Sequence, residues 1–279
     1  MRAALKFHLR TVAVGLAMVF SGATLAISEP FQAGVEAAFP PWSYVENGEF
    51  KGIAIDAVRE IAKEQGFEVE FKDLPWASLI PALGANKIDM LVTGMFATAE
   101  RDKIIDYAIP WWESNDVVVV AKDSQRTVAS ALCCEARIGT QAGSAHDGWI
   151  KDNLVEGELP TGVTLQTYED FIGAAEDLKI GRIDSIVMTP DIAEDLITKG
   201  RDLKQVGVIL TNRPWAMAVG QGDPKTILPK LNKGMVDLYK SGRWAEIVHV
   251  YLPTAAIPPI PGNMPKELES YAQTPPGLE

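Results

Sequence analysis

Cysteine and histidine are both scarce in this sequence of 279 residues, which has two cysteines and three histidines. The cysteines, Cys133 and Cys134, are adjacent, and no Cys-x-x-Cys pair occurs. His8 lies near the N-terminus, while His146 and His249 are far apart in the chain. These counts argue against a disulfide-rich scaffold and against a zinc site built from cysteine and histidine. We therefore expect no metal and no cofactor.

The two adjacent cysteines leave three possibilities open. They can pair with each other, stay free or cross-link two chains. An ordinary disulfide joins Cα atoms that are further apart than one peptide step. We therefore expect Cys133 and Cys134 to have no structural role.

Long hydrophobic runs are also missing, apart from a short one near the N-terminus. Three basic residues within the first ten precede an apolar run over residues 11–20, and small residues follow up to Ala26. This pattern predicts a secretory signal peptide over residues 1–26, cleaved after Ala26. The run is shorter than the roughly 20 residues of a membrane-spanning helix. No cysteine lies near the cleavage site, which argues against a lipid anchor there.

Positive charge is in deficit. Without residues 1–26, the chain has 23 Lys and Arg against 37 Asp and Glu, a formal charge of −14. Such a charge argues against nucleic acid or an anionic membrane surface as a partner. The composition, 47% hydrophobic and 23% charged, is otherwise that of a globular protein with one or two domains.

The segment IDMLVTGMFATAER, which ends at Arg101, carries the clearest chemistry. Met90–Val92 has the composition of a buried parallel strand, and Gly94 allows a tight turn after it. Thr98 is a good N-cap for a helix whose first turn contains Arg101. Free backbone N–H groups and the guanidinium would then converge on one small anion, most simply a carboxylate. The alternative is a strand–helix loop in which Phe96 packs inside and Arg101 forms a surface ion pair.

Strands and helices alternate along the rest of the chain, with glycine turns between them. The expected strands cover residues 31–38, 67–71, 117–121, 137–140, 164–168 and 215–220, and the expected helices include 56–65, 171–179 and 227–241. This alternation predicts an α/β protein with mostly parallel sheets flanked by helices.

A weak internal sequence repeat indicates two similarly built lobes. Lys87–Asp89 and Arg182–Asp184 both place Ile-Asp between a helix and a buried strand. Chain crossings near 117–121 and 215–220 predict a two-strand hinge with a cleft between the lobes. The expected divisions are lobe 1 over 28–119 and 216–253, lobe 2 over 120–215, and a Pro-rich tail over 254–279.

From residue 31 to about residue 251, the sequence resembles the periplasmic solute-binding proteins of ABC importers, polar-amino-acid type, family 3. The motifs that carry the resemblance are Glu36–Trp42, Gly52–Asp56, Leu79–Leu83, Lys87–Asp89, Thr98–Arg101 and Arg137–Ser144. The resemblance implies the two-lobed periplasmic-binding-protein fold. It also implies a monomeric, non-enzymatic protein in the periplasm that delivers a small zwitterionic ligand to an ABC permease in the inner membrane.

The resemblance implies ligand-binding roles for several residues of the first lobe. Arg101 matches the arginine that binds the ligand carboxylate, and Glu36 matches an acidic position near the ligand cation. Phe39 matches an aromatic residue that stacks on the ligand, and Trp76 matches a second aromatic wall. Gly94 matches a position whose backbone contacts the ligand.

In the second lobe, Ser144 and the backbone around Gly143 match a carboxylate contact. Two residues depart from the family pattern. Ala145 stands where a hydroxyl residue is common. Thr189 stands where an Asp usually holds the α-ammonium group, and Asp191 could replace that Asp through a shifted loop.

Phe96 is a third departure, because amino-acid binders usually carry Ser or Thr there. Together with Glu36, Phe39, Trp76 and Arg101, it resembles the aromatic box of ectoine-binding members of the family. Three aromatic faces suit a diffuse, poorly hydrated cation. The alternative is that the aromatic residues belong to the core, that Glu36 caps a turn or pairs with a lysine, and that Arg101 is structural.

Other functions stay open at this point. The ligand could be a polar amino acid or an opine. A periplasmic dehydratase of the same fold would need Glu36 or His146 as a general acid. A dehydrogenase-associated interaction protein of this fold would have a cleft that binds nothing, and the Pro-rich tail leaves that possibility open.

Overall fold

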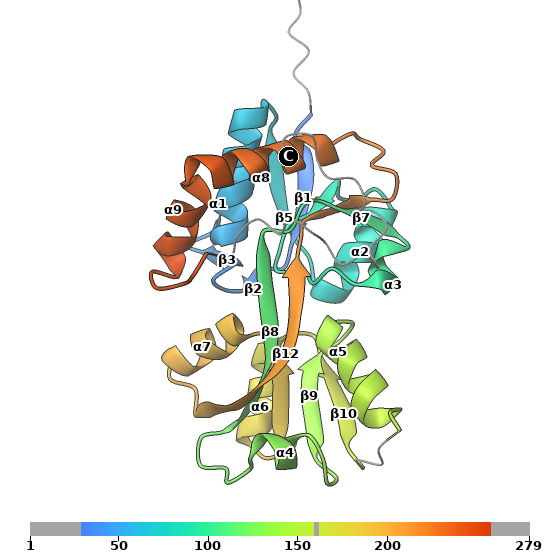
Figure 1. Ribbon diagram of the computed structural model, residues 1–279, viewed down its shortest axis with the longest axis vertical. Coiled ribbons are helices and arrows are strands. Elements are labelled where there is room, and N and C mark those ends of the chain that lie inside the picture. The colour runs from blue at the N-terminus through green and yellow to red at the C-terminus, as the bar shows by residue number, and fades with distance from the viewer. Residues whose placement is uncertain (1–28, 159–161, 258–279) are drawn as a thin grey trace, which may run out of the picture.

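The computed structural model describes residues 29–158 and 162–257. They form two lobes joined by strands β8 (Trp112–Ala121) and β12 (Leu203–Trp215), which run side by side between the lobes in Figure 1. The predicted two-lobed α/β fold is confirmed. The predicted signal peptide and all but the first residues of the Pro-rich tail lie outside the described residues.

Lobe 1 is built on a five-stranded sheet with the order β5-β1-β6-β13-β7. Its strands are β1 (Phe31–Val35), β5 (Val69–Asp73), β6 (Met90–Leu91), β7 (Ile105–Tyr107) and β13 (Ala218–Gly220). Strand β1 is parallel to β5 and β6, whereas β13 is antiparallel to β6 and β7. A small second sheet contains β2 (Ala38–Phe39), β3 (Ser43–Glu46) and β4 (Glu49–Lys51).

Five helices accompany these sheets in the described part of lobe 1. They are α1 (Ile53–Gln65), α2 (Trp76–Gly84), α3 (Ala99–Asp102), α8 (Leu228–Ser241) and α9 (Arg243–Tyr251). Helix α1 ends as expected at Gly66, whose left-handed φ of 69° only glycine adopts easily. The hairpin between β3 and β4 turns at Asn47 and Gly48, which both have positive φ.

Lobe 2 has its own five-stranded sheet, with the order β10-β9-β11-β8-β12. The strands not yet given are β9 (Arg137–Gln141), β10 (Thr164–Tyr168) and β11 (Ser185–Met188). The helices are α4 (Val128–Ala131), α5 (Ala145–Ile150), the π-helix η1 (Lys151–Val155), α6 (Phe171–Lys179) and α7 (Pro190–Thr198). Strands β9, β10 and β11 are parallel, and β8 and β12 are antiparallel to their neighbours.

The hinge differs from the prediction. A single strand over 215–220 is wrong, because β12 ends at Trp215 and β13 begins at Ala218. The strand expected over 117–121 begins earlier, at Trp112, and pairs with β11 and β12 of lobe 2. The predicted boundary after residue 119 therefore cuts through the second sheet. Strand β12 was not predicted because Gly207, Asn212 and Pro214 interrupt its pattern, and its pairing contains two irregularities.

The first strand is also shorter than predicted. The expected strand over 31–38 is wrong at its end, because β1 stops at Val35 and Ala38 belongs to β2 of the small sheet. The break places Glu36 directly after β1, at the carboxyl end of the sheet.

The adjacent cysteines form a disulfide with each other. It lies in a turn where Cys134 and Glu135 both have a φ of 63°. The expectation that Cys133 and Cys134 have no structural role is therefore wrong, since the bond is part of the turn that leads into β9.

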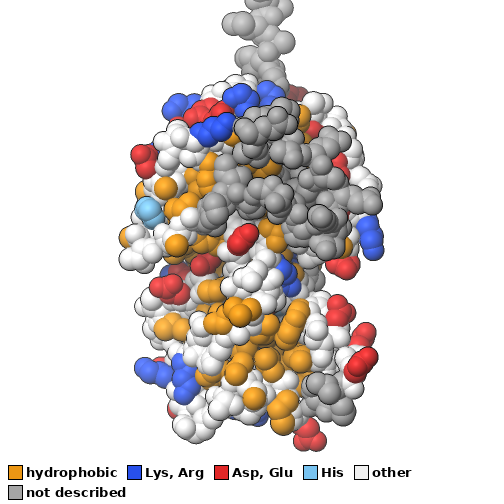
Figure 2. All heavy atoms as spheres, viewed as in Figure 1, with side chains coloured by type: hydrophobic (Ala, Val, Ile, Leu, Met, Phe, Trp, Pro, Cys, Tyr) orange, Lys and Arg blue, Asp and Glu red, His pale blue; other side chains and the backbone are white. Residues whose placement is uncertain are grey.

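One face of lobe 2 is partly apolar. Figure 2 shows hydrophobic side chains gathered on the visible face of the lower lobe. Val208 and Leu210 are exposed on β12, an edge strand of the lobe 2 sheet.

No helix in the described ranges is both long and apolar enough to cross a membrane. Within the same ranges, His, Cys, Asp and Glu nowhere gather in a way that could hold a metal ion.

Candidate functional site

The predicted site residues meet where the two lobes face each other. Strands β1 and β6 run parallel, so Glu36 after β1 and Gly94 after β6 lie at the same edge of the first sheet. The end of β9 in lobe 2 supplies the opposing turn, which begins at Gln141. Ligands of open α/β sheets bind at such carboxyl ends of strands.

Arg101 reaches across the interface between the lobes. The side chain of Thr98 caps α3 by accepting a hydrogen bond from the Arg101 amide, as predicted. The buried guanidinium donates from Nη1 to the Phe96 carbonyl (2.7 Å) and from Nη2 to the Gly143 carbonyl of lobe 2 (3.0 Å). It also lies over the Trp76 ring, 5.2 Å from the centroid. The alternative of a surface ion pair is therefore wrong.

Glu36 makes a second contact between the lobes. Its side chain is buried, and Oε1 accepts a hydrogen bond of 2.5 Å from Nε2 of Gln141 in lobe 2. Oε2 has no hydrogen-bond partner among the described residues. Burial raises the pKa of Glu36 to about 8, although the hydrogen bond from Gln141 acts in the opposite direction. The alternative in which Glu36 pairs with a lysine is not what the structure shows.

Trp215, which the sequence did not single out, is central to the aromatic part of the site. Its ring centroid lies 5.7 Å from that of Phe39, 5.4 Å from that of Phe96 and 4.8 Å from that of Trp42. Gly94 faces this cluster, since a Cβ there would lie 2.4 Å from Trp215 and 2.5 Å from Phe39. A glycine is therefore needed at position 94 to let the aromatic rings pack.

Phe96 is enclosed by the protein's own side chains. Its ring makes edge contacts with Trp215 and with His146, at 5.4 and 5.5 Å between centroids. The Arg213 guanidinium carbon lies 4.4 Å from the ring centroid. Two of the three rings predicted to hold a ligand cation, Phe96 and Trp76, therefore already contact an arginine of this chain.

Arg213 belongs to a buried ionic cluster at the hinge. It donates from Nη2 to both carboxylate oxygens of Asp116 (2.6 and 2.5 Å) and from Nη1 to the Ala145 carbonyl (3.1 Å). Nδ1 of His146 lies 3.0 Å from Asp116. Burial alone raises the pKa of Asp116, but His146 and Arg213 outweigh it and hold the pKa below its ordinary value. This cluster joins both hinge strands to α5 of lobe 2, and Arg213 also contacts Phe96 of lobe 1.

The turn after β9 is fixed by its own capping contacts. Ser144 caps α5 by accepting a hydrogen bond from the Asp147 amide, and the Gly143 amide donates to Oδ2 of Asp147 (2.9 Å). Gly143 has a φ of 68°, which favours glycine. The Gly143 amide thus already has an acceptor, whereas the Ser144 hydroxyl hydrogen can still be donated.

The beginning of α7 supplies Thr189 and Asp191. Thr189 is buried, and its hydroxyl has no hydrogen-bond partner among the described residues. Asp191 accepts a hydrogen bond of 3.0 Å from Nε1 of Trp42 in lobe 1. Burial raises the pKa of Asp191 above its ordinary value. Asp191 is therefore a third connection between the lobes, and one of its oxygens is already occupied.

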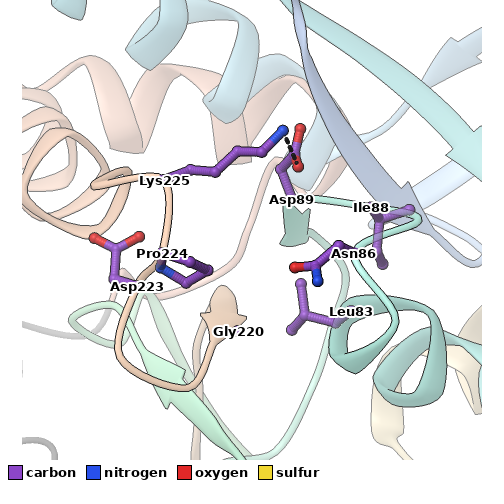
Figure 3. A pocket seen from close by; sticks show the side chains of 8 residues that line it. All are labelled: Leu83, Asn86, Ile88, Asp89, Gly220, Asp223, Pro224 and Lys225. Carbon is purple, nitrogen blue, oxygen red and sulfur yellow. Dashed lines mark ion pairs between the residues drawn. The ribbon is translucent and has the colours of Figure 1, made fainter.

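A small cavity elsewhere in lobe 1 has no room for a solute. It lies beside the end of β13, where Leu83, Asp89 and Gly220 contribute to its lining (Figure 3). Its volume of about 10 Å³ corresponds to roughly one water molecule. Lys225 at its rim pairs with Asp89 at 2.7 Å. Because β13 is antiparallel to β6, this cavity lies at the opposite end of the sheet from Glu36 and Gly94.

Named relatives of the chain are amino-acid-binding proteins. It is 30% identical over 244 residues to ABC transporter arginine-binding protein 1 of Escherichia coli, covering 85% of this chain and 96% of that protein. It is 26% identical over 212 residues to the L-cystine-binding protein TcyJ of the same species, covering 75% and 77%. Both names describe binding proteins rather than enzymes.

Solved structures agree with this relationship. An ancestral arginine-binding protein bound to arginine superposes with a TM-score of 0.73 and 31% identity, covering 81% of this chain and 99% of that chain. The ancestral amino acid-binding protein AncCDT-1, a precursor of cyclohexadienyl dehydratase, superposes with a TM-score of 0.69 and 25% identity, covering 80% and 94%.

The family model for "Bacterial extracellular solute-binding proteins, family 3" matches residues 31–254. This range contains both lobes and all the residues of the candidate site. The chain therefore belongs to family 3 of the bacterial extracellular solute-binding proteins.

Proposed function

We propose that this protein captures a compact zwitterionic solute in the periplasm and delivers it to an ABC permease. The observation that carries the proposal is a buried carboxylate oxygen without a partner, Glu36 Oε2, at the same interface as the buried cation of Arg101. Relatives named for binding arginine and cystine, which carry both charges, support this ligand class.

Glu36 and Arg101 both contact the same short segment of lobe 2, which favours a compact ligand. Glu36 contacts lobe 2 at Gln141, and Arg101 contacts it at Gly143. The Cα atoms of Gln141 and Gly143 are two residues apart, at most about 7 Å along an extended chain, so both contacts fall on one short segment of lobe 2. A ligand whose cation and carboxylate are separated by a few atoms suits such spacing.

Glu36 is the acid best placed to receive the ligand cation. The other carboxylates near the lobe interface have partners: Asp116 contacts Arg213 and His146, and the half-buried Asp191 accepts a hydrogen bond from Trp42. Asp147 is paired with Lys151 and with the Gly143 amide. A buried carboxylate oxygen with no partner is unfavourable, so a ligand N–H would be strongly stabilised there.

The pocket chemistry favours a delocalised cation over a primary ammonium group. A primary ammonium has three donors to satisfy and is strongly hydrated. Glu36 offers it one carboxylate, and Thr189 occupies the position where the family usually has a second acid. A ring amidinium, as in ectoine, has fewer donors and suits an aromatic wall such as Phe39. We therefore propose an ectoine-like ligand, with a polar amino acid or an opine as the alternative.

A true ligand should stabilise the protein in a thermal-shift screen of ectoine, amino acids and opines. Binding to the folded state alone adds RT ln(1 + [L]/Kd), about 2.7 kcal/mol at a hundredfold excess over Kd. For a protein of this size, that corresponds to a rise in Tm of roughly 5–10 °C. If none of these zwitterions raises the Tm, the result would contradict the proposal and favour an interaction protein whose cleft binds nothing.

Phe96→Ser should shift the ligand preference. It removes the ring that packs between Trp215, His146 and Arg213 and restores the hydroxyl that amino-acid binders usually carry, so ectoine affinity should fall by about 2 kcal/mol or more, roughly 30-fold. Standard amino acids should lose less or gain slightly. The measurement is competition between ectoine and a panel of amino acids.

The matched control is Phe96→Leu, which keeps most of the apolar volume against Trp215 and Arg213 but lacks the ring. If Phe96→Leu binds ectoine as wild type does, the ring of Phe96 only packs. If wild type prefers a standard amino acid, the ectoine proposal is wrong and Asp191 becomes the candidate partner of the ammonium group.

A further inference from the structure

Glu36 is surrounded by acids rather than by cations. The charged groups that act on it most strongly are Asp170 and Glu169 before α6 and Asp73 at the end of β5, and all three raise its pKa. Gln141, from β9, is its hydrogen-bond partner, and the same Nε2 also donates to the Glu169 carbonyl (3.0 Å). The groups that act most strongly on the Glu36 carboxyl are therefore three acids and one neutral amide.

A carboxylate in such surroundings does not stay charged without compensation. Burial removes water from the ion, and no cation of the described chain replaces it at Oε2. The group then takes up a proton.

We propose that the cleft exchanges a proton for the ligand cation at Glu36. In the closed form without ligand, the Glu36 side chain is a protonated, neutral carboxylic acid. When ligand binds, the O–H bond breaks, the proton passes to solvent buffer, and the ligand N–H⁺ donates to the carboxylate. This exchange rests on the proposed function, since it requires a cationic ligand at this site.

The direction of the pH dependence follows from the two pKa values. The carboxyl has an ordinary pKa of 4.5 and a buried pKa of about 8. The protonated closed form is fully favoured below the ordinary value and is lost as the pH rises through about 8. Proton and ligand compete between these values. Ligand Kd should therefore fall by about tenfold per pH unit from pH 5 to 7.5 and level off above pH 8.

Calorimetry in two buffers of different ionisation enthalpy at pH 6.5 measures this exchange directly. The probes are ectoine and L-arginine. Binding to wild type should release about one proton per ligand, and binding to Glu36→Gln should release close to none. The matched control is Asp195→Asn, whose carboxylate pairs with Lys199 on the surface of α7 away from the site, and which should still release the proton.

Several outcomes would overturn the exchange. One is binding to wild type without proton release, and another is release that persists in Glu36→Gln. A titration of the Glu36 carboxyl carbon by NMR, without ligand, needs no binding and should give a midpoint near 8. A midpoint near 4.5 contradicts the exchange whether or not ectoine and arginine bind. If neither probe binds but the midpoint lies near 8, the ligand class fails and the protonated closed acid stands.

Discussion

Arg101→Ala is expected to weaken ligand binding by about 2–5 kcal/mol, or roughly 30-fold to several thousand-fold. The guanidinium is buried and already oriented by the Phe96 and Gly143 carbonyls, so it can receive a carboxylate without reorganising. Removing it leaves that carboxylate in a desolvated site without its cation. Calorimetry with the ligand selected by the thermal-shift screen gives the change in Kd.

The matched control for Arg101→Ala is Arg59→Ala. Arg59 also places its guanidinium over an aromatic ring, that of Phe71, at 5.4 Å, but it lies on the surface of lobe 1. Its loss should leave Kd within about twofold of wild type. A folded Arg101→Ala protein with near-normal affinity would place the carboxylate contact elsewhere in the cleft.

Asp116→Asn is expected to produce the largest loss of stability. The change leaves the Arg213 guanidinium beside a neutral amide in a buried site, and breaking such a pair costs about 3–5 kcal/mol. The Tm should fall by roughly 6–20 °C, measured by scanning calorimetry. The pKa of Asp116 lies below its ordinary value of 3.8. Its charged carboxylate therefore stabilises the folded protein above pH 3.8, and this stabilisation is lost as the pH falls through the lowered pKa.

Asp195→Asn is the control for this loss. Asp195 pairs with Lys199 on the surface of α7, and such an exposed pair contributes less than about 1 kcal/mol. A similar Tm for both variants would contradict a stabilising role for the hinge cluster.

Local signals in the sequence located the parts of the site that depend on neighbours in the chain. Thr98 caps α3 and places Arg101 at its predicted position, since capping involves residues three positions apart. Strand β10 and helix α6 have the predicted bounds because strand and helix patterns also depend on neighbours in the chain. Glu36 was predicted from the Glu36–Trp42 motif, although the strand expected to run to residue 38 ends before it, at Val35.

Residues that act across the lobes gave no local signal. Gln141 is 105 positions from Glu36, and Arg213 is 97 positions from Asp116. Trp215 packs against Phe39 from the far end of β12, a strand that the sequence pattern did not predict. Amphipathic periodicity describes which face of an element is buried but not which distant element covers it.

The most direct test is a crystal structure of the protein with its tightest-binding zwitterion. We expect the ligand between the lobes, with its cation within hydrogen-bond distance of Glu36 Oε2 and its carboxylate on the Arg101 guanidinium. A ligand bound away from both groups, or one whose carboxylate avoids Arg101, would contradict the proposed binding site.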